Sequence, residues 1–248
     1  MASRLLLFGG IRTPKDNLLA GLAADGILPL LDRLWLFAQP TAALALVDLI
    51  AGATATAVNS PTFTANKGYA GNGSTSYINT GYVPTTNAVT FSQNKAHLAL
   101  YDRSANAMSG VVILCGAQEG ISTKSLTVFT NGGSWASGVN TNATPNENTT
   151  PANRQGMTIV TRTADGNGGF KRYSNGVDTG ATTTAGSTVT PPAFAIYIGG
   201  LNRAGSLVAP TIDEISMFSV GAGLNATQAA ALSSRINAYM TAIGSNVY

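Results

Sequence analysis

The sequence predicts an all-β sandwich with helical segments at both ends, on the basis of three observations. Only 10% of the 248 residues are charged while 44% are hydrophobic, so Thr, Ser, Asn and Gly must cover much of the surface. Between about residues 51 and 220, short apolar runs alternate with Gly- and Asn-rich turn signals, which is typical of many short strands. Near both ends, apolar residues recur at helical spacing.

The charge balance and the scarcity of Cys and His exclude several classes of protein. The net charge is only +3, so no nucleic-acid partner is expected. The single cysteine, Cys115, excludes an internal disulfide and a multi-Cys zinc site, and the single histidine, His97, leaves little room for His-based clusters. The most apolar stretch, Ile27–Ala38, carries two charged residues and is too short to span a membrane.

The N-terminal part is rich in Leu and Ala, which predicts short helices around one strand. Asp16 is expected to cap a helix that runs to Ala24 and ends near Gly26. Leu31–Phe37 is expected to form a first strand, and Ala42–Ile50 a second short helix.

The Thr-, Ser-, Asn- and Gly-rich region contains the candidate strands of the sandwich. Asn175-Gly176 is the strongest hairpin signal, because a type I′ turn needs positive φ at both positions. The stretch Asn140–Asn153 has no periodicity and is expected to form a long exposed loop. The candidate strands are Ser76–Thr80, Ala96–Asp102, Val111–Gly116, Leu126–Thr130, Met157–Thr163, Phe170–Ser174, Phe194–Gly199 and Thr211–Ser219.

A helix is expected again at the C-terminus, over residues 225–243. Asn225 and Gln228 resemble a capping box with Asn in the first position, and Gly244 can end the helix. The chain therefore divides into an N-terminal attachment region, residues 1–40, with helix and strand, and a β-sandwich over residues 41–248 that carries the C-terminal helix.

Several segments in order resemble one known family. Val47-Asp-Leu precedes a Gly-rich segment that ends in Tyr77-Ile-Asn-Thr-Gly; Tyr173-Ser-Asn-Gly-Val lies in the middle; Ile196-Tyr-Ile-Gly-Gly and Thr211-Ile-Asp-Glu-Ile follow. Their order and spacing resemble the laminin G-like branch of the concanavalin A-like lectin/glucanase fold. The resemblance implies a jelly-roll sandwich.

The resemblance also carries an expectation about function, because such domains occur in structural proteins of tailed bacteriophages. It implies a non-enzymatic bacteriophage virion protein of tail-fibre or adhesin type, made in the host cytoplasm, with host-surface polysaccharide as its candidate ligand. The expected partners are other virion proteins and further copies of the chain, and no membrane insertion is expected.

Glycan-cleaving enzymes of this fold use two closely spaced carboxylates, which on one strand lie two or four residues apart. The 11 acidic residues give no such pair, so we expect no catalytic residue and no enzyme activity. Asp213 is expected to share the apolar face of its strand with Ile215 and Met217, as a buried acceptor for turn N–H groups. His97 is expected to be structural.

No cluster of carboxylates predicts a metal site, and no cofactor is expected. Calcium often accompanies this fold, and a calcium site made of Asn side chains and backbone carbonyls stays open.

Sugar binding needs aromatic faces beside planar amide or charged groups. Trp135, in a glycine-flanked turn, is predicted to be an exposed stacking ring, although Trp and Tyr in a sandwich more often pack in the core. The candidate glycan contacts are Trp135, Tyr82, Tyr173, Asn175, Asn202 and Arg203.

An alternative is a capsid or tail decoration protein that stabilises the particle without binding sugar. An apolar N-terminal face that includes Leu18, Leu22 and Trp35 would suit contacts with neighbouring proteins.

Overall fold

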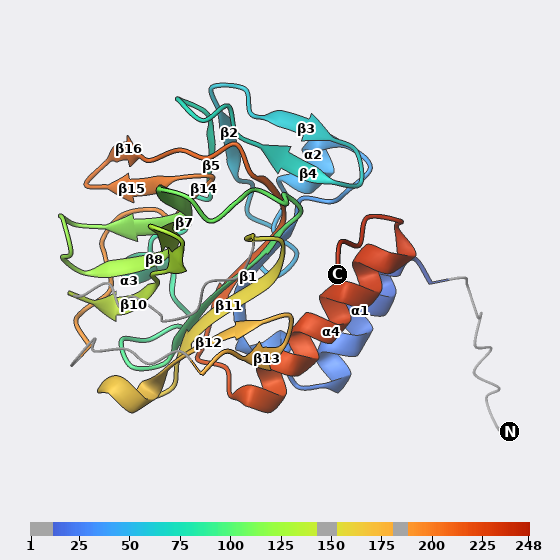
Figure 1. The fold of residues 1–248 in the computed structure, drawn as a ribbon. Coiled ribbons are helices and arrows are strands. Elements are labelled where there is room, and N and C mark those ends of the chain that lie inside the picture. Colours follow the sequence, from blue (N-terminus) through green and yellow to red (C-terminus); the bar gives the residue numbers. More distant parts are fainter. Residues whose placement is uncertain (1–11, 143–152, 181–187) are drawn as a thin grey trace, which may run out of the picture.

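Residues 12–142, 153–180 and 188–248 are described here from a computed structural model, in which two β-sheets lie face to face (Figure 1). The first sheet is 8-stranded, in the order β13-β12-β11-β6-β17-β4-β3, with β1 also paired to β17. The second is 9-stranded, in the order β10-β8-β7-β14-β5-β2, with β9, β15 and β16 attached. The prediction of an all-β jelly-roll-like sandwich with a C-terminal helix is confirmed.

The elements have the following bounds. The first sheet contains β1 (Leu31–Leu36), β3 (Thr62–Thr64), β4 (Gly68–Ala70), β6 (Ala96–Asp102), β11 (Gly156–Arg162), β12 (Phe170–Ser174), β13 (Val177–Asp178) and β17 (Glu214–Gly221). The second contains β2 (Thr56–Val58), β5 (Tyr77–Asn79), β7 (Val111–Gln118), β8 (Ser125–Asn131), β9 (Ser134–Trp135), β10 (Gly138–Thr141), β14 (Tyr197–Ile198), β15 (Leu201–Arg203) and β16 (Ser206–Val208). The helices are α1 (Pro14–Ala24), α2 (Ala42–Ala45), α3 (Pro84–Asn87) and α4 (Ala226–Ala242), with 3-10 turns at Leu28–Leu30 and Asn167–Gly169.

The two faces of the 8-stranded sheet pack against different partners. Its inner face meets the 9-stranded sheet, and there the rings of Trp35 and Phe218 stack with centroids 6.1 Å apart. Its outer face is covered by α1 and α4, which lie side by side at the right of Figure 1, over a second apolar cluster that includes Leu22 and Ile236. Both long helices therefore lie on one side of the sandwich, away from the outer face of the 9-stranded sheet.

The helix ends follow capping chemistry, with two differences from the prediction. Thr13, not Asp16, is the N-cap of α1; Asp16 occupies the third helical position of the capping box and hydrogen-bonds back to Thr13. The second helix stops at Ala45, because the chain turns there toward Asp48, whose carboxylate accepts from backbone N–H groups. The capping box of Asn225 and Gln228 at α4 is confirmed.

The prediction that Asp213, Ile215 and Met217 share one face is wrong beyond Ile215. The register of β17 against β6 shifts between Ile215 and Met217. Such a bulge inserts a residue and reverses the alternation of side chains. Ile215 therefore lies in the core between the sheets, whereas Met217 lies in the cluster under the helices.

The Asn175-Gly176 hairpin is confirmed: both residues have positive φ (50° and 84°), and Ser174 pairs with Val177 across the turn. The loop expected from residue 140 begins later, since Asn140 and Thr141 belong to β10 and are buried. Residues 143–152 of that stretch lie outside the described residues.

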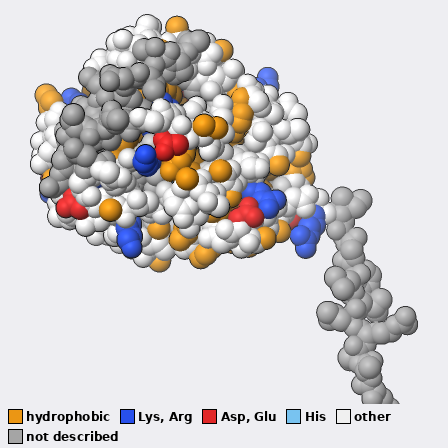
Figure 2. Space-filling model, turned by 60° about the horizontal axis from the view of Figure 1, so that its bottom comes forward, with side chains coloured by type: hydrophobic (Ala, Val, Ile, Leu, Met, Phe, Trp, Pro, Cys, Tyr) orange, Lys and Arg blue, Asp and Glu red, His pale blue; other side chains and the backbone are white. Residues whose placement is uncertain are grey.

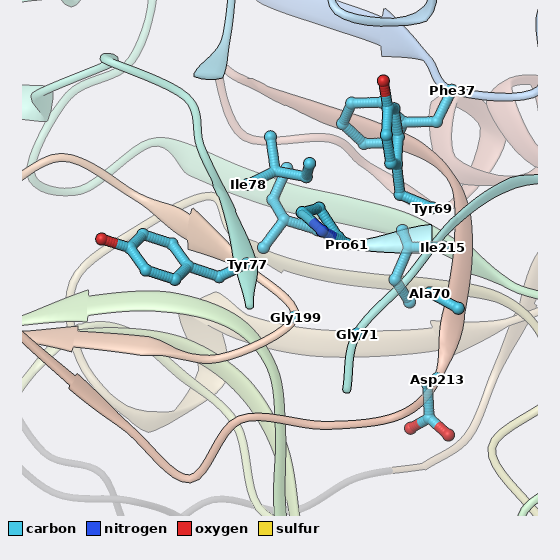
Figure 3. Close-up of a pocket in the computed structure, with 11 residues that line it drawn as sticks. Phe37, Pro61, Tyr69, Ala70, Gly71, Tyr77, Ile78, Gly199, Asp213 and Ile215 are labelled. Carbon is cyan, nitrogen blue, oxygen red and sulfur yellow. The ribbon is translucent and has the colours of Figure 1, made fainter. Parts of the chain in front are cut away.

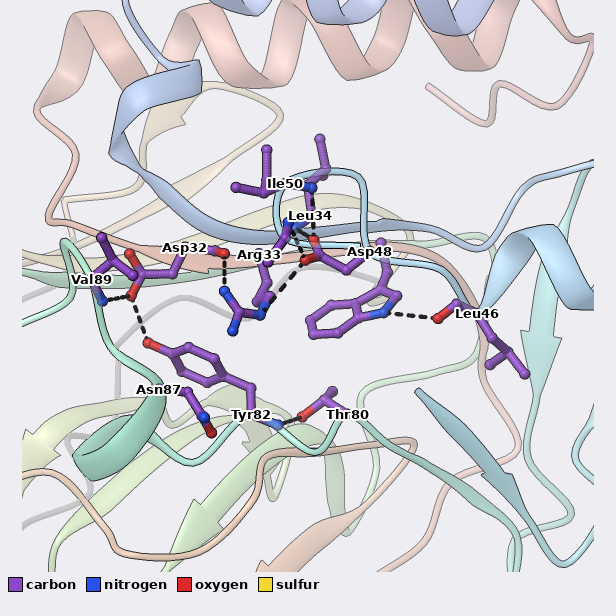
Figure 4. A network of polar contacts seen from close by, with 12 residues as sticks. Asp32, Arg33, Leu34, Leu46, Asp48, Ile50, Thr80, Tyr82, Asn87 and Val89 are labelled. Atoms are coloured by element: carbon purple, nitrogen blue, oxygen red, sulfur yellow. Dashed lines mark hydrogen bonds and ion pairs between the residues drawn. The ribbon is translucent and has the colours of Figure 1, made fainter. Parts of the chain in front are cut away.

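Two buried carboxylates hold β1 in the first sheet (Figure 4). Asp32 accepts from the Tyr82 hydroxyl at 2.7 Å and from the backbone N–H groups of residues 89–91. Asp48 accepts from the N–H of Leu34 at 2.7 Å and forms an ion pair with Arg33 at 3.6 Å. Residues before the expected boundary at position 40 thus form part of the sheet through the pairing of β1 with β17.

The apolar N-terminal face expected to meet neighbouring proteins is used inside the molecule. Leu18 and Leu22 pack in the cluster between α1, α4 and the first sheet, and Trp35 packs between the sheets. All three side chains are buried, because α4 and the second sheet cover them.

His97 is structural, as expected. It is fully buried, and Nδ1 lies 2.6 Å from the carbonyl oxygen of Ala222, which can only accept; Nδ1 must therefore carry the proton. Nε2 then accepts from the Ser219 hydroxyl at 3.2 Å. Burial lowers the pKa of His97 to about 4.

This depressed pKa predicts a loss of stability in mild acid. Since the pKa of His97 is about 4 in the fold and 6.5 for an unperturbed histidine, the folded state binds fewer protons between these values, and its stability falls as the pH drops from 6.5 toward 4. We expect this residue alone to contribute a loss of about 3 kcal/mol over that window. Urea unfolding at a series of pH values gives the free energy of unfolding at each pH. Between pH 6.5 and 4 this free energy should fall less steeply for His97→Gln than for the wild type, and an equal fall in both proteins would contradict the low pKa of His97.

Candidate functional site

The interior of the sandwich leaves no room for a ligand where β4, β5 and β17 meet (Figure 3). The rings of Phe37 and Tyr69 lie with centroids 6.0 Å apart, and Ile78 and Ile215 fill the remaining space. The crevice holds about 10 Å³, room for one water molecule at most. This crevice is therefore too small to be a ligand site.

A groove of about 170 Å³ crosses the outer face of the 9-stranded sheet, opposite the side that packs on the first sheet. The alternation of side chains along β8 explains this placement, because successive residues of a strand point to opposite faces of the sheet. Leu126 and Val128 face the core, so Thr127 and Phe129 face outward. The groove is lined by Val111, Ile113, Gln118, Ile121, Ser122, Thr127, Phe129, Leu201 and Arg203.

One half of the groove is an apolar shelf, formed by Val111, Ile113, Ile121 and Phe129. Ile113 and Phe129 are cross-strand partners on β7 and β8, so their side chains lie against each other. Val111 is 54% exposed and Ile121 79% exposed, and in the groove they join Ile113 and Phe129 in one apolar patch rather than standing alone. A shelf of this kind can hold the C–H face of a sugar ring or another flat apolar group.

The other half of the groove is polar and is formed by Gln118 and Arg203. Gly199, with φ of 81°, lets the chain reverse between β14 and β15. After this turn β15 runs parallel to β7, with Arg203 level with Gln118. Arg203 Nε donates to Gln118 Oε1 at 3.0 Å, which fixes the guanidinium at the edge of the shelf.

Two of the residues predicted from the sequence lie at this groove. Arg203 lines it. Asn202, next to it, is almost fully buried: its side-chain amide donates to the Ala195 carbonyl at 2.8 Å and its oxygen accepts from the Gly205 N–H at 2.8 Å. Asn202 therefore builds the turn that carries Arg203 and has little surface of its own to offer a ligand.

Trp135 is not the exposed ring that the sequence predicts. It is 2% exposed and packs between the sheets, with the Arg172 guanidinium 5.0 Å from the centre of its ring. The reason is alternation: β9 pairs with β8, which turns Ser134 outward and Trp135 inward.

The remaining predicted contacts lie elsewhere and are not brought together. Tyr82 is buried between the sheets, where its hydroxyl donates to Asp32. Tyr173 is buried under the helices. Asn175 is exposed at its hairpin, where its side chain accepts from the Met157 N–H at 2.8 Å, and the hairpin lies close to α4.

The fold also brings together two carboxylates that sequence spacing does not connect. Asp102 is the last residue of β6 and pairs with Ile215 of β17, which brings it near Asp213. The side chains of Asp102 and Asp213 are both fully buried. Arg154 binds both oxygens of Asp213, at 2.9 and 3.0 Å, and Asn106 also donates to it. Burial and the charge of Asp213 raise the pKa of Asp102 well above its usual range.

This cluster corrects the expected environment of Asp213: it is a buried acceptor, but the donors to its carboxylate are the side chains of Arg154 and Asn106 rather than turn N–H groups. A hollow of about 410 Å³ lies beside the cluster, lined by Asn106, Arg154 and Ile212, but neither Asp102 nor Asp213 lines it. The two acids are thus enclosed by protein and by the Arg154 guanidinium.

Among the described residues, no group of three or more His, Cys, Asp or Glu side chains is arranged to hold a metal ion. None of the helices in those residues is both long and apolar enough to cross a bilayer. Figure 2 shows a face of the molecule that is mostly neutral, with few Lys, Arg, Asp and Glu groups, some of which lie as adjacent pairs of opposite charge.

No protein-family model matches the chain, and no curated protein matches its sequence. Solved structures do resemble its fold. A mutant of Trypanosoma rangeli sialidase with trans-sialidase activity superposes with a TM-score of 0.57 at 12% identity, over 91% of this chain and 39% of the sialidase chain. The chain thus spans about two fifths of the length of that enzyme.

Two further structures are of comparable similarity. Domain 4 of the extracellular arabinanase AbnA from Geobacillus stearothermophilus, in complex with arabinotriose, gives a TM-score of 0.51 at 16% identity, over 82% of this chain and 98% of the domain. The binding domain of botulinum neurotoxin serotype D gives 0.56 at 14% identity, over 86% of this chain and 52% of that chain. At these identities the likeness shows the fold, a sandwich shared with glycosidases and a sugar-bound domain.

The position of Trp135 predicts a structural effect on mutation. Trp135→Ala should lower the free energy of unfolding by about 3–5 kcal/mol, because it leaves a cavity between the sheets. Trp135→Phe, which keeps most of the volume, should cost less. Chemical denaturation checks both variants. A Trp135→Ala protein that is as stable as the wild type but has lost ligand binding would contradict this role.

Proposed function

We propose that this protein is a non-enzymatic, lectin-like sandwich of a bacteriophage virion that binds host-surface glycan in the groove on its 9-stranded sheet. The observation that carries the binding part is the groove itself: an exposed apolar shelf beside a fixed guanidinium and carboxamide. Sugars are amphipathic in the same way, with an apolar ring face and polar edges.

Two further observations support the proposal. The fold is shared with a domain solved in complex with arabinotriose. The enclosure of Asp102 and Asp213 supports a non-enzymatic role, because an acid pair that cleaves a glycan has to reach the scissile bond from both sides. The assignment to a virion rests on the resemblance of the sequence segments to domains of phage structural proteins.

Replacing the aromatic member of the shelf should weaken glycan binding. Phe129→Ala removes the aromatic ring that lines the groove, and we expect affinity for a bound glycan to fall about tenfold. The measurement is titration of the full-length protein against glycans selected from a broad array, with and without EDTA, because a calcium site made of Asn side chains and backbone carbonyls stays open.

Val89→Ala is the matched control, since Val89 is exposed but does not line the groove. Its affinity should equal that of the wild type. Equal affinity of the Phe129→Ala protein, with both variants folded, would move the binding site away from this groove; absence of any glycan binding would contradict the proposed function.

A second candidate function, a decoration protein that holds neighbouring virion proteins, is favoured by one specific feature. A mostly apolar hollow of about 250 Å³ lies where α1 and α4 meet α2, lined in part by Pro14, Pro40, Leu44 and Ile243. Leu44 is exposed there. This surface lies on the helical side, away from the groove, so the same molecule could attach through it to a sister subunit or another virion protein.

Leu44→Asp tests this attachment surface. A charge in the hollow should abolish assembly, seen as loss of self-association in sedimentation and loss of the protein from purified particles, while the melting temperature stays close to that of the wild type because Leu44 is exposed. Unchanged assembly would rule this surface out.

A further inference from the structure

We propose that the groove selects glycans that carry a carboxylate, and that it binds this group through Arg203 and Gln118. The inference rests on the proposed function, since it names the class of sugar that the same groove would take.

Arg203 is held in place without having its charge neutralised. Within the described residues, it forms no ion pair, and its Nε bonds the neutral carboxamide of Gln118. Its terminal nitrogens, Nη1 and Nη2, make no hydrogen bond to any described residue. By contrast, ion pairs to Asp or Glu are formed by Arg33, Arg103, Arg154 and Arg235.

Gln118 adds a second donor beside this cation. A guanidinium has no acceptor, so the Gln118 atom that it contacts must be the oxygen, and the carboxamide NH₂ group is left as a donor. No described residue accepts from that NH₂ group. Gln118 lines the groove but is only 3% exposed, so its donor lies at the floor, and the Arg203 guanidinium beside it supplies the positive charge. Together they match a group that only accepts and is negative.

Across the part of the chain that the structure describes, no acidic side chain lines the groove. Glu119, which follows Gln118 in the chain, forms an ion pair with Lys124 at 2.9 Å and also accepts from the Ala193 N–H at 3.3 Å. Its charge is therefore balanced within its own loop and does not serve as the counter-ion of Arg203.

The apolar shelf distinguishes a sugar acid from a free anion. Phe129, Ile113 and Ile121 lie in the same groove as the guanidinium, so a ligand that fills it needs an apolar face next to its negative group. A pyranose with a carboxylate on the ring, as in a uronic acid, has both features. The guanidinium can hold the carboxylate with two parallel hydrogen bonds while the ring lies on the shelf.

The test compares one set of glycans in two chemical forms. Bacterial polysaccharides that contain glucuronic acid are immobilised as they are, and after reduction of their carboxylates to alcohols; binding of the full-length protein is then measured at low and high salt. The proposal predicts at least about tenfold tighter binding to the acidic form, weakened by salt. Arg203→Gln should remove that preference, and Arg203→Lys should restore it in part, because lysine keeps the charge but not the planar fork.

Arg235→Gln is the matched control, because Arg235 is an exposed arginine on α4, on the other side of the sandwich. It should keep the preference in full. Equal binding to the acidic and reduced forms, a preference that survives in Arg203→Gln, or binding to neutral array glycans alone would overturn the inference while the proposed function stands. Absence of binding to every glycan, in either form and on the array, would overturn the proposed function itself.

Discussion

The buried carboxylate of Asp32 is the interaction on which the arrangement of the two sheets depends. It lies on β1 in the first sheet and accepts hydrogen bonds from Tyr82 and from the N–H groups of residues 89–91, in the connection that carries the chain from β5 in the second sheet to β6 in the first. Burial raises the pKa of Asp32, but hydrogen bonds from Thr90, Val89 and Tyr82 outweigh burial and hold this pKa below its usual range. The ionised form is thus the one that the fold stabilises, and one side chain fixes both β1 and the crossover between the sheets.

Most regular elements can be predicted from the sequence because their signals are local. The capping box of α4, the Asn-Gly hairpin and the strand Ala96–Asp102 each depend on residues within one segment. The bulge in β17 cannot be predicted, because it is defined by its register against β6, more than a hundred positions away in the chain. The N-cap of α1 is ambiguous in the sequence for a different reason: Thr13 and Asp16 are both good capping residues, and only their mutual hydrogen bonds show which one lies outside the helix.

The candidate site can be predicted only in part, for similar reasons. Arg203 stands out because it follows a turn signal, but Gln118 carries no signal of its own and becomes relevant only through the parallel pairing of β15 with β7. The inward position of Trp135 is hidden because a two-residue strand has no alternation from which its facing can be inferred. Asp102 and Asp213 lie far apart in the chain and meet only through the alignment of β6 with β17.

The pairing of β1 with β17 has a consequence for how the molecule would respond to force. The two strands are antiparallel neighbours, one following α1 and the other preceding α4, and Leu31 at the start of β1 lies opposite Gly221 at the end of β17. Tension applied between α1 and α4 would load the ladder at this one end, so its hydrogen bonds would break in succession rather than together.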